Sequence, residues 1–179
     1  MADTAATPAS AEDHNDLFNA FQTSVHLVEE SNVFNHVFTV LGASGDLAKK
    51  KIYPTLWALF RDKLVPDQTY FVGYARSSID MRKFLTDTCY KFMKVREGEE
   101  QLFAEFVARN YYLAGSYDKP ESFQALNAEI LRVSKIYSSL SECNRIFYLA
   151  LPPSVYTSVT ELLSHHCKAS KWVLELHRT

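Results

Sequence analysis

The chain has 179 residues, of which 47% are apolar and 22% are charged, and its formal net charge is −2 at neutral pH. This composition is typical of one globular domain with a sizeable core, and it excludes collagen-like and low-complexity chains. Because the charge is nearly balanced and no apolar run reaches the roughly 18 residues of a membrane helix, we expect neither nucleic acid nor a membrane as a partner.

Three cysteines are spread along the chain, at Cys89, Cys143 and Cys167. They form no C-x-x-C pair and have no histidine at zinc-finger spacing, so the sequence predicts reduced thiols and no metal site. The first sixteen residues contain several carboxylates but no basic segment followed by an apolar run, unlike a signal or transit peptide. We therefore expect a protein of the cytosol.

Residues 1–35 are rich in Ala, Thr, Ser and Asp and predict a flexible tail with room for one short helix. After it, apolar runs of strand length alternate with stretches of helical period over residues 36–170. The predicted strands are Val37–Leu41, Tyr70–Ala75, Tyr111–Gly115 and Ile146–Leu151. Their nearly continuous apolar character is typical of parallel strands covered on both faces. The pattern predicts an α/β fold with a Rossmann-like, doubly wound parallel sheet.

The stretches between these strands carry apolar residues at spacings of three and four, which predicts amphipathic helices. In the first helix the predicted apolar stripe is Leu47, Ile52, Leu56, Leu59 and Phe60. Pro54 lies inside this stripe, removes one backbone donor and is expected to kink a helix that continues beyond it.

The most informative segment is the turn Gly42-Ala43-Ser44-Gly45, which joins the first strand directly to a helix beginning at Asp46-Leu47-Ala48. Unpaired N–H groups at a helix N-terminus, its dipole and nearby glycines together favour an anion such as a phosphate. The spacing is G-x-x-G-x-x-A, so Ser44 replaces the usual second glycine. It fits neither the nucleoside triphosphate loop nor the hydrolase elbow. The alternative is that the glycines only relieve a tight turn.

Arg76 follows the second predicted strand, in Gly73-Tyr74-Ala75-Arg76-Ser77. An NAD site places a carboxylate near this point to bind the ribose 2′-hydroxyl, whereas a guanidinium suits a 2′-phosphate. Arg76 therefore favours NADP over NAD as the cofactor. The alternative is an ordinary solvated charge.

The fourth predicted strand ends in Leu149-Ala150-Leu151-Pro152-Pro153, and Tyr156 follows. Carboxyl ends of parallel strands share one edge, so this turn is expected to face the glycine turn. From spacing alone, a helix start marked by proline is the favoured interpretation.

Three motifs in order resemble the N-terminal part of the eukaryotic glucose-6-phosphate dehydrogenase family: Gly42 through Pro54, Val72 through Arg76, and Phe147 through Pro153. The resemblance covers roughly His36 to Ser170. It implies NADP as cofactor and oxidation of glucose 6-phosphate to 6-phosphogluconolactone, in the pentose phosphate pathway. It places the cofactor diphosphate at Gly42, Ala43, Ser44, Gly45, Asp46 and Leu47, and the 2′-phosphate at Arg76. It places the nicotinamide side at Ala150, Leu151, Pro152, Pro153 and Tyr156, and puts Lys51 near the reacting groups.

The chain departs from this family over residues 171–179, where the family continues into Glu-Lys-Pro-Phe-Gly. We expect the family's catalytic histidines, its larger substrate domain and its oligomer interface to be absent, which leaves the sheet incomplete at its C-terminal side and the chain inactive by itself. Five of the six histidines are expected to be structural or solvated: His26, His36, His165, His166 and His177.

Two other interpretations stay open. One is a non-catalytic NADP-binding protein, either a truncated isoform or an incomplete gene product. The other is a short-chain dehydrogenase or epimerase, because Tyr90 and Lys94 have the Tyr-x-x-x-Lys spacing of that class. The pair follows the second strand instead of the fourth, which makes coincidence the favoured explanation.

Overall fold

The computed structural model describes residues 35–136 and 143–169. The chain divides into two units, Met1–Val33 and Phe34–Thr179, and the described residues belong to the second. The predicted tail lies outside the described residues except for Asn35, and so does the end predicted to diverge from the family, residues 171–179.

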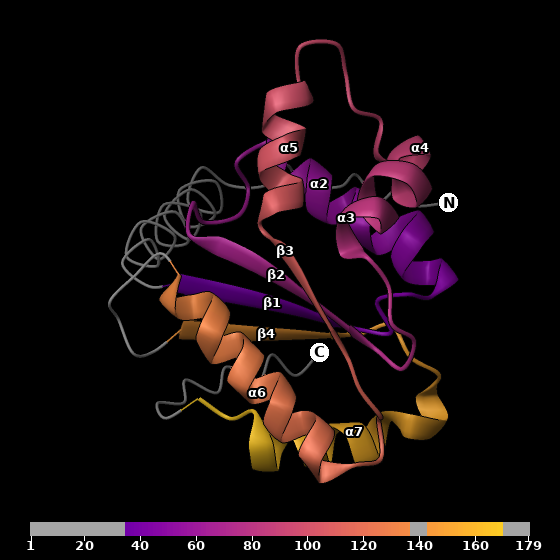
Figure 1. The fold of residues 1–179 in the computed structure, drawn as a ribbon, viewed down its shortest axis with the longest axis vertical. Coiled ribbons are helices and arrows are strands. Elements are labelled where there is room, and N and C mark those ends of the chain that lie inside the picture. The colour runs from indigo at the N-terminus through magenta and orange to yellow at the C-terminus, as the bar shows by residue number, and fades with distance from the viewer. Residues whose placement is uncertain (1–34, 137–142, 170–179) are drawn as a thin grey trace, which may run out of the picture. The chain divides into compact units, whose positions relative to one another are not determined.

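The described unit is built around a four-stranded parallel sheet in the order β3-β2-β1-β4 (Figure 1). The strands are β1 (Asn35–Leu41), β2 (Thr69–Ala75), β3 (Asn110–Ala114) and β4 (Cys143–Leu149). Leu41 is in register with Tyr74 of β2 and with Leu149 of β4, so these strands end at one common edge. This is the predicted Rossmann-like α/β architecture, and each strand lies within three residues of its predicted position.

Helices cover both faces of the sheet (Figure 1). On one face lie α2 (Tyr53–Arg61), α3 (Met81–Lys83), α4 (Tyr90–Met93) and α5 (Glu100–Ala108), with the π-helical segments η1 (Ala48–Ile52) and η2 (Phe84–Cys89). The other face carries α6 (Pro120–Lys135) and α7 (Tyr156–His166), which follows the short 3-10 helix η3 (Pro153–Val155). Among the described residues, none of these helices combines the length and apolar character needed to cross a membrane.

Pro54 lies in the first turn of α2, directly after η1. The Tyr53 N–H donates to the Ala48 carbonyl, a wider turn than in an α-helix. Because proline has no N–H and its ring crowds the preceding turn, a π-helical turn is a natural way to carry the chain past it. The predicted continuation of the helix is confirmed.

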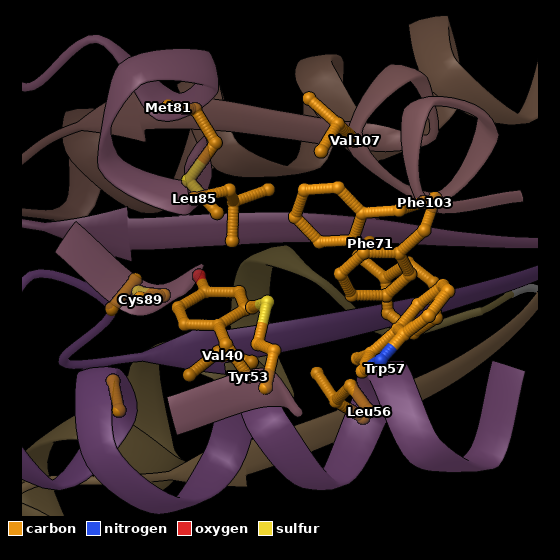
Figure 2. Packing of buried hydrophobic residues seen from close by; sticks show 14 residues of the cluster. Val40, Tyr53, Leu56, Trp57, Phe71, Met81, Leu85, Cys89, Phe103 and Val107 are labelled. Carbon is orange, nitrogen blue, oxygen red and sulfur yellow. The ribbon is translucent and has the colours of Figure 1, made fainter. Parts of the chain in front are cut away.

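The core on the α2–α5 face is aromatic. The Trp57 ring lies 5.3 Å from that of Phe103 and 5.6 Å from that of Phe106, and Phe71 of β2 lies 5.4 Å from Phe106. Figure 2 shows Trp57, Phe71 and Phe103 of this cluster close together. Leu47, predicted to be part of this apolar stripe, is 49% exposed. The prediction was wrong there because Leu47 precedes the turn at which the helix begins to pack. Leu56 is buried as predicted, and Tyr53 and Trp57, which the predicted stripe did not include, are buried too.

The other core joins β1, β2 and β4 to α6 and α7 through Val37, Leu41, Val72, Phe123, Ile130 and Val159. Strands β1 and β2 are buried along nearly their whole length. In β4, by contrast, residues on one face are buried or half-buried while Asn144, Ile146 and Tyr148 are exposed. The prediction that all four strands are covered on both faces was therefore wrong for β4.

Candidate functional site

The glycine turn links the ends of three strands. The Gly42 and Ala43 N–H groups both donate to the Tyr74 carbonyl of β2, at 2.8 and 3.2 Å, and the Ala150 N–H after β4 donates to the Leu41 carbonyl at 2.8 Å. The Gly45 N–H donates to the Gly42 carbonyl at 2.9 Å, which closes the turn. These bonds fix the turn at the carboxyl edge of the sheet, as predicted from the chain order.

Gly42 has a φ of +87°, a conformation that residues with a side chain rarely adopt. A Cβ added there would lie 2.2 Å from the Ala150 carbonyl oxygen and 3.2 Å from Cδ2 of Leu151. The structure thus brings the predicted residues Gly42, Ala150 and Leu151 together. The glycine is required both by its backbone conformation and by the close approach of the two turns.

The anion-binding capacity of the turn resides in a few main-chain groups. The N–H groups of Ser44, Asp46 and Leu47 have no acceptor in the part of the chain that the structure describes, and they lie where the helix begins. Those of Gly42, Ala43 and Gly45 already have acceptors. Three free donors at a helix start suit a diphosphate.

Asp46 would oppose an anion at this helix start if its charge were not balanced. Its carboxylate pairs with the Lys50 ammonium at 2.8 Å and with that of Lys49 at 3.0 Å. These hydrogen bonds, that of Lys50 first, hold the pKa of Asp46 below its ordinary value. Two lysines against one carboxylate leave a net positive charge beside the turn.

Arg76 is exposed directly after β2, and its guanidinium lies over the Tyr117 ring, 5.8 Å from the centroid. Tyr117 follows β3 and is half-buried. Burial raises its pKa, and a hydrogen bond with the Gly42 main chain acts in the opposite direction. Tyr117 therefore lies close to both Arg76 and the glycine turn.

Hydroxyl groups from two loops meet beside Arg76. The Ser44 Oγ of the glycine turn lies 2.8 Å from the Ser77 Oγ, and the Tyr112 hydroxyl of β3 donates to the Ser77 carbonyl. Sequence reasoning missed Ser77, Tyr112 and Tyr117. A signal for Tyr117 does exist, because it follows the third predicted strand as Arg76 follows the second.

The Leu-Pro-Pro turn begins η3 and α7, so the interpretation of the prolines as a helix start is confirmed. Pro152 has an extended backbone and Pro153 is the first residue of η3; both are exposed. The Tyr156 hydroxyl donates to the Leu149 carbonyl at 3.3 Å, which keeps the tyrosine at the end of β4. Lys51 is exposed on η1, one turn beyond Ala48.

Tyr90 and Lys94 do not form an active-site pair of the short-chain dehydrogenase type. The Tyr90 ring packs edge-on against Phe103 of α5, with 5.3 Å between centroids. Lys94 ends α4 in a left-handed conformation, with a φ of 50°. This geometry does not support that class.

The described histidines all lie away from the glycine turn. His36 is near the amino end of β1, and His165 and His166 are at the C-terminal end of α7. Within residues 35–136 and 143–169, no group of three or more His, Cys, Asp or Glu side chains is arranged to bind a metal ion.

Comparisons with known proteins all point to the same protein family. Residues 39–176 match the family model described as "Glucose-6-phosphate dehydrogenase, NAD binding domain". Glucose-6-phosphate 1-dehydrogenase of Takifugu rubripes is 52% identical over 136 residues, which are 76% of this chain and 25% of that protein. That of Drosophila melanogaster is 47% identical over 132 residues, or 74% of this chain and 24% of the relative. The chain thus spans about a quarter of the length of the curated relatives it matches.

Solved structures of the same family also resemble this chain. One described as "Glucose-6-phosphate dehydrogenase in complex with its substrate glucose-6-phosphate" superposes with a TM-score of 0.69 at 34% identity, covering 76% of this chain and 29% of that one. Glucose-6-phosphate 1-dehydrogenase from Mycobacterium avium superposes with a TM-score of 0.59 at 20% identity, over 74% of this chain and 27% of that one, a similarity that shows the fold alone.

Proposed function

Because this chain belongs to the glucose-6-phosphate dehydrogenase family and carries its NAD binding domain, we propose that it binds NADP at the carboxyl edge of the sheet. The observation that carries the proposal is the meeting, at one edge, of free main-chain donors and an exposed guanidinium. Residues 42–47, Arg76 and the turn at 150–153 come from three different strand ends, and all reach that edge.

The diphosphate binds at the helix start after β1. The N–H groups of Ser44, Asp46 and Leu47 supply donors, and Lys49 and Lys50 offset the Asp46 charge. Gly42 allows the β4 turn to approach, and Gly45 is exposed with no side chain to obstruct a ligand. The residues present therefore fit the cofactor.

The ribose 2′-phosphate binds between Arg76 and the hydroxyl groups of Ser44 and Ser77. A guanidinium presents paired donors to a phosphate, and neighbouring hydroxyl groups add further donors. The described loop after β2 offers no carboxylate directly beside Arg76 that would suit a 2′-hydroxyl instead; Asp80, four residues later, caps α3 through the Lys83 N–H.

The nicotinamide side lies along residues 150–153 with Tyr156, and Lys51 lies on the adjoining helix. NADP, when bound, supplies the hydride acceptor. In the complete enzymes of this family, the domain serves oxidation of glucose 6-phosphate to 6-phosphogluconolactone. No described histidine lies at this edge, so residues 35–136 and 143–169 bind the cofactor without supplying a histidine base for turnover.

The test is a calorimetric titration of the full chain with NADP and NAD. We expect tighter binding of NADP, and we expect Arg76→Glu to weaken NADP binding at least about tenfold, since hydrogen bonds to charged groups are worth about 1.5–3 kcal/mol, while NAD binding changes little. Arg96→Glu is the matched control, because it makes the same charge change on the loop between α4 and α5. Equal losses for both cofactors in Arg76→Glu would refute the assignment.

Turnover is tested separately, by the absorbance of NADPH in a mixture of the chain, NADP and glucose 6-phosphate. No NADPH above the level of a protein-free control is expected. Sustained NADPH formation would show that the chain holds a base that this interpretation lacks.

A further inference from the structure

The Tyr112 side chain on β3 extends over Gly73 of the neighbouring strand β2 and reaches the glycine turn. It is in register with Gly73 of β2. A Cβ added at Gly73 would lie 2.9 Å from Cδ2 of Tyr112, 3.0 Å from the Cβ of Ala43 and 2.8 Å from the Tyr53 hydroxyl oxygen. Gly73 therefore leaves the space through which the Tyr112 ring reaches the turn.

The phenol end of Tyr112 meets both loops of the site. It donates to the Ser77 carbonyl, and the Ser44 and Ser77 hydroxyl groups lie beside it. Burial of the half-buried ring raises the pKa of Tyr112, and the contacts with Ser44 and Ser77 oppose this rise. The phenol consequently stays protonated near neutral pH and remains a donor.

Ser44 and Ser77 come from segments 33 residues apart in the chain, yet their Oγ atoms are 2.8 Å apart. Both side chains are at least partly exposed, so burial alone does not hold them together. The bond from Tyr112 to the Ser77 main chain supplies a fixed point, because it anchors the exposed loop to a sheet strand.

We propose that Tyr112 is a positioning residue for selectivity: it holds the loop after β2 against the glycine turn, so that Ser44 and Ser77 present their hydroxyl groups together to the 2′-phosphate. This inference rests on the proposed NADP site and deepens it. Groups that are ordered before binding lose less conformational entropy when the ligand arrives. NAD has no 2′-phosphate, so the ordering of these hydroxyl groups before binding raises its affinity little.

The test compares Tyr112→Phe with Tyr111→Phe in the full chain, by calorimetric titration with NADP and with NAD. Tyr112→Phe keeps the ring and removes the phenol donor. We expect NADP binding to weaken about fivefold, within the range for one hydrogen bond, and NAD binding to change less than about twofold. Tyr111 faces the opposite core, next to α6, so its variant controls for loss of a tyrosine hydroxyl from the same strand. It is expected to leave the NADP preference unchanged.

A double-variant cycle separates positioning from a structural role. If Tyr112 acts through Ser77, Tyr112→Phe combined with Ser77→Ala loses little more NADP affinity than Ser77→Ala alone. Ser77 is exposed, so Ser77→Ala is expected to fold and gives a test even if Tyr112→Phe does not. An unchanged NADP preference in Ser77→Ala would overturn the proposal.

The other outcomes are equally distinct. Equal weakening of both cofactors in Tyr112→Phe, with a lower melting temperature, would make Tyr112 a purely structural residue and overturn the inference. An unchanged preference in a folded Tyr112→Phe would do the same while leaving the NADP site intact. If the wild-type chain itself shows no preference for NADP, the proposed function fails before the role of Tyr112 is reached.

Discussion

Strands β2 and β4 are both rich in apolar residues, yet they are buried differently. All seven residues of β2 are buried, whereas in β4 exposed residues alternate with buried or half-buried ones. The reason is position: β2 lies between β1 and β3 with helices on both faces, while β4 ends the described sheet and, among the described elements, is covered by the α6–α7 layer alone. An apolar strand is thus fully buried only where helices pack against both of its faces.

This difference bears on how the site is held. The loop after β2, which carries Arg76 and Ser77, starts from a strand fixed on both faces. The turn after β4 starts from a strand that is packed on one face only. The position of this turn depends on the contact between Gly42 and Ala150. The central strand is the rigid part of the site, and the glycine turn secures the edge strand to it.

The largest effect is expected in the central strand. Phe71→Ala removes a side chain that is 1% exposed and packs against Phe106 and Phe38, so it should lower the free energy of unfolding by about 3–5 kcal/mol. Urea denaturation followed by tryptophan fluorescence measures the loss. A loss below about 1 kcal/mol would mean that the aromatic core does not hold β2.

The next effect concerns the contact that secures β4. Gly42→Ala imposes left-handed strain and places a methyl group against the Ala150 carbonyl, so the combined loss should be about 2–5 kcal/mol. Gly98→Ala is a matched control, because Gly98 has a φ of +86° but no atom within 4 Å of an added Cβ. It should cost about 1–2 kcal/mol, from strain alone. Equal losses in the two variants would show that the approach of the β4 turn does not constrain Gly42.

The smallest effect is expected on the uncovered face of β4. Ile146 is 47% exposed, so Ile146→Ala should cost about 1 kcal/mol or less, roughly half the value of a fully buried side chain. The same denaturation experiment measures it. A loss as large as that of Phe71→Ala would contradict the difference between the two strands and require that this face be covered in solution.

The sequence predicted the approximate positions of the helices and strands better than the residues at which they begin and end. β1 begins at Asn35 and β4 at Cys143, earlier than the predicted Val37 and Ile146. Parallel pairing joins Asn35 to Cys143 and His36 to Asn144 through the main chain. Backbone hydrogen bonds do not depend on whether a side chain is apolar, so an apolar run can miss residues at a strand end, such as Asn35 and His36, even though both are buried.

The sequence by itself determined the order of elements, the glycine turn and the place of Arg76 after the second strand, because periodicity and turn chemistry are local properties of the chain. Only the tertiary structure decided that one face of β4 stays uncovered, that Gly42 is packed against Ala150, and that Tyr112 reaches Ser44 and Ser77 across Gly73. Those contacts depend on strand order and register, which bring together residues that no spacing in the sequence relates.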